Sequence, residues 1–393
     1  MKSADISIMY HLVGEQPLPV FLAAKQFMGC KHVLWHTERS AKTGNDLCEV
    51  MTEQQMQVEK RLIGSENVAY DILQLRDIFG RAFRDDVERN ECIGLNATGG
   101  TKPMSLVGLT TLQATAQRDR FMACYVDSTN ERLMSLAGDW ASEDFHTGMT
   151  ISEFLGIAGA KILGKNLDAG YEIMATRQDI VMALWKSRAC LQRYQGELAK
   201  FTDKRVASLR TPPGSYLEFM AQASEKHPVF ATIHGHDSFK SDWRAEARFL
   251  AGGWFEEYCF WKISTARGKE RIKEIRVGLK PAWRSGQVPV QEFDVCYTDG
   301  LRLFILECKA GALTQDYVQK LENICAHFSG SLGRAALVSV NDVGLYKVVA
   351  DRFRNSNNLA CFSGGDGVDS LCKDIWHIAP GDLNRKKAAV NGQ

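Results

Sequence analysis

The 393-residue sequence lacks the features of membrane-spanning, secreted and zinc-binding proteins. It has no run of about 18 apolar residues to span a bilayer, and Met1–Tyr10 has a strand pattern instead of the apolar core of a signal peptide. Its 11 cysteines are odd in number, form no Cys-x-x-Cys motif and lie in part inside apolar runs, so they indicate neither zinc nor disulfides. We therefore expect a cytoplasmic protein with reduced thiols and no membrane contact.

The sequence also lacks an excess of positive or negative charge. The sequence has 48 Lys and Arg residues against 47 Asp and Glu residues, so its net charge of +1 gives no general attraction to nucleic acid. Any contact with nucleic acid must come from local patches. Basic residues recur between residues 244 and 284, with Trp261 and Trp283 available for base stacking, although ordinary solvated charges produce the same pattern.

Two common phosphate-binding motifs are missing as well. The chain has neither a Walker A loop ending in Gly-Lys-Ser/Thr nor a Gly-x-Gly-x-x-Gly motif. It has instead Asn-Ala-Thr-Gly-Gly-Thr-Lys at residues 96–102, between an expected strand at Cys92–Leu95 and an expected helix at Met104–Gln117. Glycines let a backbone approach a ligand closely, and N–H groups at a helix start attract anions. The run is therefore either a phosphate cradle or an ordinary glycine-rich turn.

Strands and helices alternate over the first 137 or so residues, which predicts a parallel, doubly wound sheet. The expected strands are residues 6–13, 32–37, 68–75, 92–95, 121–127 and 132–137, and the expected helices are residues 18–28, 45–62, 78–88 and 104–117. Ligands bind such sheets beyond the carboxyl ends of the strands. The loops expected at that edge are residues 14–17, 37–43 and 96–102, and all three carry hydrogen-bonding side chains.

A β-hairpin is predicted in the C-terminal part of the chain. Val290–Thr298 and Leu301–Lys309 are apolar, β-prone runs separated by Asp299-Gly300, a dipeptide that favours a two-residue turn. Such a turn would pair Asp294 with Ile305.

This pairing places two acids and a lysine on one face of the sheet. Because strand side chains alternate, Asp294, Glu307 and Lys309 share a face, and the two acids are diagonal neighbours at roughly 7–8 Å between backbone positions. Glu307-Cys308-Lys309 is the only acid-x-Lys triplet in the sequence, and it closes a hydrophobic strand. The alternative is that these residues form a solvated strand edge.

A third acid is expected from a helix. Residues 243–263 have apolar side chains at helical spacing, which places Glu256 on a helix beside the sheet, with the adjacent Glu257 as the alternative. Three acids can hold a divalent cation against a phosphodiester, while a lysine steadies the attacking water or the developing charge. The pattern predicts a metal-dependent nuclease.

Both regions together resemble the CRISPR-associated Rossmann fold (CARF) nucleases. The N-terminal region has Val-Gly-Glu-Gln-Pro-Leu-Pro at residues 13–19 and the run at residues 96–102. The C-terminal region has a helix acid, a strand acid and a strand Glu-x-Lys in the order of the PD-(D/E)xK nucleases, with Gly-Gly-Trp-Phe-Glu at Gly252–Glu256. The resemblance covers residues 1 to about 139 and about 242 to 339.

The resemblance implies an α/β fold in three parts. These are an N-terminal Rossmann-like, doubly wound CARF domain at residues 1–139, a partly helical connector at residues 140–241, and a C-terminal PD-(D/E)xK, restriction-endonuclease-like α/β domain at residues 242–393. The implied function is that of a type III CRISPR antiviral effector, a homodimer switched on by a cyclic oligoadenylate. The resemblance favours cyclic tetra-adenylate over the hexamer, and an endonuclease that cuts DNA, RNA or both with little sequence specificity.

The resemblance also implies roles for individual residues. The expected contacts to the cyclic oligoadenylate are Gly14, Gln16, Pro17, Thr37, Asn96, Thr98, Gly99, Gly100, Thr101 and Lys102. In the nuclease, Mg²⁺ or Mn²⁺ would be held by Asp294, Glu307 and the carbonyl of Cys308, with Glu256 on a second metal or its water and Lys309 orienting the nucleophilic water.

Two other functions stay open at this point. The chain could be a restriction-type or repair endonuclease that cuts without any small nucleotide. It could instead be a noncatalytic nucleotide sensor. The intact Asp294, Glu307 and Lys309 argue against the sensor, because a dead site has no reason to retain buried charges.

Overall fold

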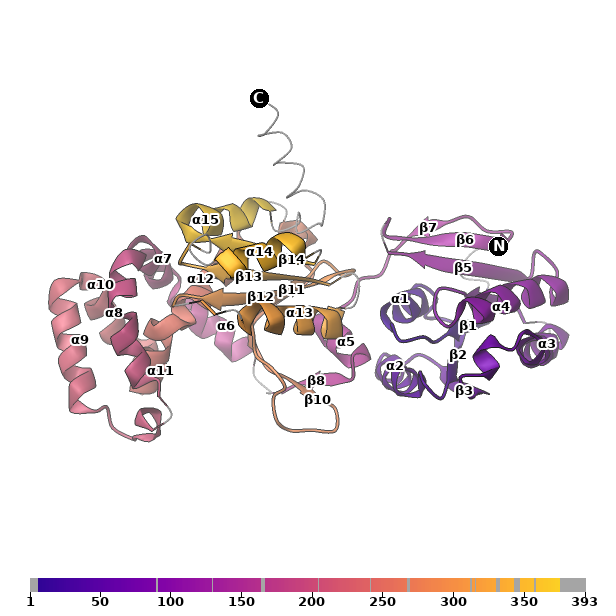
Figure 1. Ribbon diagram of the computed structural model, residues 1–393, viewed down its shortest axis with the longest axis horizontal. Coiled ribbons are helices and arrows are strands. Elements are labelled where there is room, and N and C mark those ends of the chain that lie inside the picture. Colours follow the sequence, from indigo (N-terminus) through magenta and orange to yellow (C-terminus); the bar gives the residue numbers. More distant parts are fainter. Residues whose placement is uncertain are drawn as a thin grey trace, which may run out of the picture.

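The computed structural model describes residues 6–374 apart from residues 90, 129, 164–166, 204, 241, 267–268, 312, 315, 330–332, 343–346 and 357. The chain forms two α/β domains and a group of helices, and the C-terminal α/β domain lies between the other two parts (Figure 1). Within the described ranges, no helix is long and apolar enough to cross a membrane.

The N-terminal domain is built on a seven-stranded sheet in the order β3-β2-β1-β4-β5-β6-β7, with β1 to β5 parallel and β6 and β7 antiparallel. The strands are β1 (Ile8–Leu12), β2 (Lys31–Thr37), β3 (Val58–Gly64), β4 (Ile93–Asn96), β5 (Phe121–Asp127), β6 (Arg132–Gly138) and β7 (Glu143–Asp144). The predicted doubly wound sheet is therefore confirmed.

Helices cover both faces of this sheet because its strands are apolar on both sides. Met9 of β1 packs with α1 (Leu18–Gln26) and α2 (Ala41–Glu53), whereas its neighbour Tyr10 packs on the opposite face with α3 (Ile72–Glu88) and α4 (Lys102–Thr115). On that face Trp35 stacks against Tyr10 and Phe79, with ring centroids 4.4 Å apart in both pairs.

The prediction for the third strand is wrong. Residues 68–75 were expected to be a strand, but they contain a 3₁₀ turn, η2 (Val68–Tyr70), and the start of α3, while β3 lies inside the helix expected at residues 45–62. β3 is an edge strand with mostly half-exposed side chains, so it lacks an apolar alternation. Asp71 marks the true helix start, since its carboxylate accepts hydrogen bonds from the N–H groups of Leu73 and Gln74.

The connector begins with a short helix, α5 (Ile151–Ile157), and β8 (Ala160–Ile162), and its later elements in the described part of the chain are all helices. They are α6 (Leu167–Thr176), α7 (Gln178–Lys186), α8 (Arg188–Phe201), η3 (Val206–Ser208), α9 (Gly214–Lys226), α10 (Pro228–His234) and η4 (Asp237–Phe239). The C-terminal region then starts with α11 (Trp243–Arg248), η5 (Phe249–Gly253) and α12 (Trp254–Ser264). One apolar core joins α7 and α9 to α12 and to the C-terminal sheet, so the helical group is attached to the nuclease side of the molecule.

The C-terminal domain has a five-stranded mixed sheet in the order β14-β13-β12-β11-β9. Its elements are η6 (Lys269–Arg271), β9 (Glu274–Leu279), β10 (Pro281–Trp283), β11 (Phe293–Thr298), β12 (Leu303–Lys309), α13 (Asp316–Ser329), β13 (Arg334–Ser339), α14 (Lys347–Asn355), β14 (Leu359–Ser363) and α15 (Gly364–Asp374). Helices α13 and α14 pack on one face of the sheet, and α12 and α15 pack on the other. β10 pairs with β8 away from this sheet.

We expect Gly99→Ala to destabilise the chain by about 1–3 kcal/mol, because the added Cβ would lie 2.0 Å from the backbone oxygen of Leu12. Gly196→Ala in α8 is the matched control. Its Cβ meets no atom outside its own helix within 4 Å, so alanine should stabilise the helix by about 0.5–1 kcal/mol. Urea unfolding followed by circular dichroism measures both changes. Equal effects of the two substitutions would contradict the close approach of the 96–102 loop to β1.

Candidate functional site

The acids of the hairpin lie directly opposite one another. Val295 pairs with Leu306 in the antiparallel register of β11 and β12, so extending the register by one residue sets Asp294 opposite Glu307. The expected pairing of Asp294 with Ile305 is wrong by two residues.

The turn of the hairpin explains the difference. Four residues, 299–302, connect the strands, and the carboxylate of Asp299 accepts hydrogen bonds from the N–H groups of Leu301 and Arg302 at 2.9 and 2.7 Å. Gly300 has a φ of +96°, which glycine adopts without strain. A shift of two residues keeps every side chain on its predicted face, so Asp294, Glu307 and Lys309 still share one face of the sheet.

Lys309 joins the two strand acids. Its Nζ lies 2.7 Å from Oε1 of Glu307 and 3.3 Å from Oδ2 of Asp294, and the same Asp294 oxygen accepts a hydrogen bond from the backbone N–H of Cys308 at 2.7 Å. Both carboxylates are buried. The structure thus brings together the three strand residues that the sequence selected.

Of the two candidate helix acids, the structure places Glu256 beside the strand acids. Glu257 pairs with the guanidinium of Arg177, whereas Glu256 lies close enough to Asp294 for the two carboxylates to repel each other. Burial raises the pKa of Glu256, and repulsion from Asp294 raises it further. Residue Arg177 lies in the connector, so the sequence offered no local reason to prefer either acid.

The acids crowd one another enough to resist ionisation. Burial raises the pKa of Asp294, with the charge of Glu307 as the next cause, and Lys309 only partly offsets both. For Lys309, burial alone would lower the pKa, but the attraction of Asp294 and Glu307 outweighs it and raises the pKa above its usual value. Lys309 alone therefore does not offset the burial and mutual repulsion of these acids.

A second lysine, which the sequence analysis did not identify, also reaches this site. Lys320 of α13 donates to both carboxylate oxygens of Glu307 at 2.8 Å, and Tyr317, one turn earlier, places its ring 5.1 Å from Nζ of Lys309. The two residues stand beside the buried Val318 and Leu321 on the sheet-facing side of the helix. The sequence did contain a signal for this pair: Tyr317 and Lys320 are polar, three positions apart, and adjacent to the apolar side chains of the same helix.

The donor set fits a divalent cation of the hard, oxygen-loving class. Buried carboxylates with raised pKa values gain from a nearby dication, and carboxylate and carbonyl oxygens are the ligands that Mg²⁺ and Mn²⁺ prefer. In the described part of the chain, no three Asp, Glu, His or Cys side chains are placed so that they could hold a metal ion as they stand, so a cation would need the Cys308 carbonyl or water beside the carboxylates. The lysines hold carboxylate oxygens that such an ion would use.

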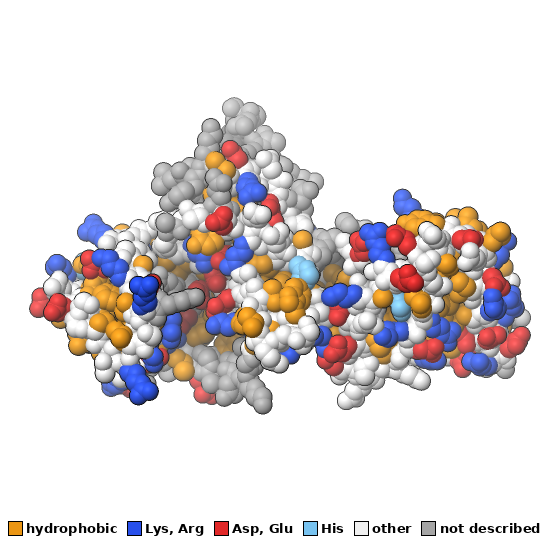
Figure 2. All heavy atoms as spheres, turned by 60° about the horizontal axis from the view of Figure 1, so that its bottom comes forward, with side chains coloured by type: hydrophobic (Ala, Val, Ile, Leu, Met, Phe, Trp, Pro, Cys, Tyr) orange, Lys and Arg blue, Asp and Glu red, His pale blue; other side chains and the backbone are white. Residues whose placement is uncertain are grey.

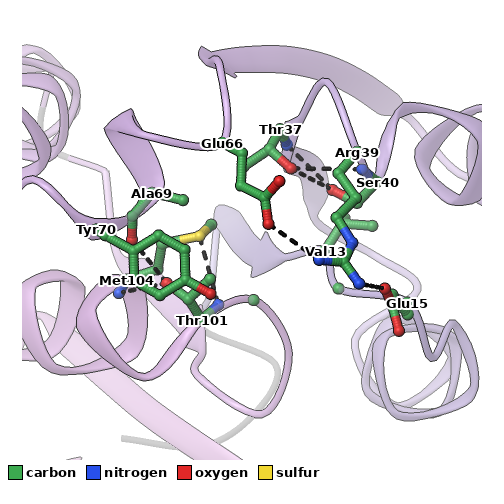
Figure 3. Close-up of a pocket in the computed structure, with 12 residues that line it drawn as sticks. Val13, Glu15, Thr37, Arg39, Ser40, Glu66, Ala69, Tyr70, Thr101 and Met104 are labelled. Atoms are coloured by element: carbon green, nitrogen blue, oxygen red, sulfur yellow. Dashed lines mark hydrogen bonds and ion pairs between the residues drawn. The ribbon is translucent and has the colours of Figure 1, made fainter.

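Two adjoining cavities lie at the carboxyl ends of the N-terminal strands. The larger, of about 310 Å³, opens between Thr37, Tyr70 and Thr101, and Arg39 lies at its side, paired with Glu15 and Glu66 (Figure 3). The smaller, of about 280 Å³, is lined by residues that include Gln16, Thr98 and Tyr125. Both cavities are lined by Gly14, Glu15 and Gly100.

Most of the expected activator contacts meet at these cavities. Those that line one or both are Gly14, Gln16, Thr37, Thr98, Gly99, Gly100 and Thr101. Lys102 is exposed at the start of α4, Pro17 is half-buried ahead of α1, and Asn96 is fully buried. These three are outside the described linings of both cavities.

Asn96 shapes the loop from beneath. Its side-chain oxygen accepts hydrogen bonds from the N–H of Thr98 at 3.1 Å and from the Thr98 hydroxyl at 2.6 Å. The same hydroxyl accepts from the N–H of Val126 at 2.7 Å, which ties the loop to β5. Asn96 therefore positions Thr98 at the rim of the smaller cavity.

The two sites lie in parts of the chain that match two known families. Residues 8–154 match the family described as the Card1 CARF domain, and residues 244–356 match the Card1-like endonuclease domain. Together the two matches cover more than half of the chain. The chain belongs to the CARF nucleases. It is an endonuclease, and the CARF domain carries the two cavities while the endonuclease domain carries Asp294, Glu307 and Lys309.

Solved structures share the whole architecture of this CARF nuclease. Can2 from Sulfobacillus thermosulfidooxidans, solved in complex with cyclic tetra-adenylate, is 16% identical with a TM-score of 0.68, and the match covers 94% of this chain and 98% of that one. Protein VC1899 from Vibrio cholerae is 17% identical with a TM-score of 0.70, over 95% and 99% of the two chains. At these identities the likeness establishes the fold alone.

A third structure is a longer relative. A type III CRISPR defence DNA nuclease activated by cyclic oligoadenylate is 16% identical with a TM-score of 0.54, and the match covers 94% of this chain but 52% of that one. No curated protein sequence matches the chain.

We expect Glu256→Gln to lower the cleavage rate by roughly 10–100-fold or more, because an amide in place of the carboxylate would be a weaker ligand for a divalent cation or its water. Glu257→Gln is the matched control one residue away. It should keep near wild-type cleavage and lower the unfolding free energy by about 1–3 kcal/mol, since Arg177 loses a charged partner. Single-turnover cleavage and urea unfolding of both variants measure this. If only the Glu257→Gln variant lost cleavage, Glu257 and not Glu256 would be the acid that acts in the nuclease site.

Proposed function

We propose that the chain is a type III CRISPR antiviral endonuclease, dependent on Mg²⁺ or Mn²⁺, that cyclic tetra-adenylate switches on. The observation that carries the proposal is the joining of a Card1 CARF domain to a Card1-like endonuclease domain in one chain. Can2, which shares the fold over nearly its full length, was solved with cyclic tetra-adenylate, and this supports the tetra-adenylate ring as the activator.

The chemistry follows from the hairpin. When bound, a divalent cation supplies Lewis-acid charge and a water of lowered pKa. Asp294, Glu307 and the Cys308 carbonyl would hold it, and Glu256 would hold a second ion or its water. The ammonium of Lys309, which contacts both strand acids, would orient the attacking water and neutralise charge that develops on the phosphate.

The activator would occupy the paired cavities of the CARF domain. The 96–102 loop approaches β1 so closely that a Cβ on Gly14 would lie 3.1 Å from the backbone N of Gly100, and the two glycines line both cavities. Backbone N–H groups in such a loop suit phosphate oxygens. Arg39 and Tyr70, at the edge of the larger cavity, offer a cation and a stacking surface.

The substrate proposal is a sequence-nonspecific one with DNA included. Attack by a metal-bound water requires no ribose 2′-hydroxyl, so RNA and DNA are both chemically accessible. On the face in Figure 2, basic side chains are interspersed with acidic ones, so contacts to phosphates would come from individual lysines and arginines that carry no base preference. The constitutive endonuclease remains the second candidate, because the nuclease chemistry itself needs no activator.

A homodimer is proposed through an exposed apolar surface on the CARF domain, made of Tyr125, Met134 and Leu136. Tyr125 pairs with Met134 across β5 and β6, so both lie on one face of the sheet. Tyr125 also lines the smaller cavity. A second copy seated there by two-fold symmetry would bring two equivalent cavities to one ring that has equivalent halves.

We expect plasmid and single-stranded DNA to be cut only when both a divalent cation and cyclic tetra-adenylate are present. The physical reason is that the sensor and the chemistry lie in different domains, so the ligand must favour the active arrangement of the chain. Cleavage rate against activator concentration measures this, with Glu307→Gln as the control that stays inactive at saturation. Equal cutting without activator would support the constitutive endonuclease instead.

We expect the wild-type chain to run as a dimer in light scattering and Met134→Arg to shift it toward the 43.9 kDa monomer, because a buried arginine would lack a partner. Val288→Arg is the control, since Val288 is exposed in the nuclease domain. Calorimetry should give one cyclic tetra-adenylate per two protomers of wild type. A ratio of one per protomer would argue against a ring shared across the two-fold axis.

A further inference from the structure

Helix α13 connects the CARF domain to the metal site. Its first half carries Tyr317 and Lys320 at the strand acids, and its last turns carry Ile324, His327 and Phe328. Lys320 and His327 are seven positions apart, which corresponds to about 10 Å at the rise of an α-helix. A small shift or rotation of this helix therefore moves both ends together.

The far end of α13 lies against the CARF domain. Ile324 and Phe328 share one buried core with Phe154 of α5 and with Val50 of α2. The ring of His327 lies 4.7 Å from that of Trp283, and burial together with the charge of Lys42 on α2 lowers the pKa of His327. The far end of α13 thus lies beside α5, which packs on α2 of the ligand-sensing domain.

Packing at this junction is tight. A Cβ on Gly156 of α5 would lie 2.7 Å from Val50 on α2, and a Cβ on the next glycine, Gly159, would lie 2.8 Å from Asp46 on the same helix. Lys25 of α1 also donates to Glu153 of α5 at 2.8 Å, and that carboxylate is buried. Because little free space separates these helices, a movement of α1 or α2 would also displace α5 and α13.

The near end of α13 controls a proposed metal ligand. Lys320 holds both oxygens of Glu307, and Lys309 shares one of them. Oxygens that accept from ammonium groups cannot give the same lone pairs to a hard cation, and an ammonium beside the ion adds like-charge repulsion. The side chain of Lys320 is about one-third exposed, at 31%, so water can solvate its ammonium when a divalent cation takes its place at the buried Glu307.

We propose that Lys320 is the residue through which the CARF domain controls the metal site: it competes with the divalent cation for Glu307, and a shift of α13 withdraws it. The control by the CARF domain rests on the proposed function, whereas the competition at Glu307 rests only on the contacts of Lys320. Lys320 is a positioning residue in this scheme. It acts on the carboxylate that would hold the ion, and not on the substrate.

The test is Mn²⁺ binding to the full chain without nucleic acid, measured from the free Mn²⁺ signal in electron paramagnetic resonance. Lys320→Met should bind Mn²⁺ about tenfold more tightly than wild type in the absence of any nucleotide. Lys320→Arg keeps the charge and should stay near wild type. Gln319→Met, an exposed change on the same helix, should also match wild type, and Glu307→Gln identifies the signal that belongs to this site.

Cyclic tetra-adenylate should tighten Mn²⁺ binding by wild type and change that of Lys320→Met much less. An unchanged or weaker Mn²⁺ affinity in Lys320→Met overturns the proposal, whatever the nucleotide does. It is also overturned if the nucleotide switches on cutting by wild type without tightening Mn²⁺ binding. A nucleotide that does neither refutes the proposed activation, while the result with Lys320→Met still decides the competition at Glu307.

Discussion

The burial of several carboxylates at one place on the C-terminal sheet is the constraint on which the nuclease site depends. Asp294 and Glu307 stand opposite each other with almost no exposed surface, and Glu256 adds its charge from a helix on the other side of the sheet. Burial and mutual repulsion both oppose ionisation. Two lysines offset part of this charge, and the contacts they make occupy oxygens that a metal ion would need.

The need to offset these buried carboxylates also connects the nuclease site to the CARF domain. Lys309 comes from the strand itself, but Lys320 comes from α13, which packs on α5, and α5 in turn packs on α2 of the CARF domain. Helix α13 therefore does two things: its Lys320 offsets the charge of the acids, and its other end forms part of the junction between the domains. Sensing and chemistry are separated along the sequence but share one packed interior.

Periodic features could be predicted from the sequence, and long-range ones could not. The face shared by Asp294, Glu307 and Lys309 was correct even though the turn was misjudged, because an error of two residues preserves the alternation of a strand. β3 was missed because an edge strand has no apolar pattern, and the neighbouring Asp71 cap was overlooked. The choice of Glu256 over Glu257 depends on Arg177, which is far away in the sequence. Lys320 was missed because its contact with Glu307 joins a helix to a strand, although its position beside the apolar stripe of α13 was a signal. The glycine-rich run identified the cavity, but Lys102 turned out to lie outside its lining.

The cap of α5 has a consequence for how the chain unfolds. Glu153 accepts hydrogen bonds from the backbone N–H and the hydroxyl of Thr150, and it also takes the ammonium of Lys25 from the CARF domain. A helix of seven residues is not stable by itself, so α5 is ordered only while both of its neighbours are. The CARF and nuclease sheets are thereby joined into one cooperative melting unit. Any molecule that binds only the folded CARF domain will therefore also protect the nuclease domain against heat.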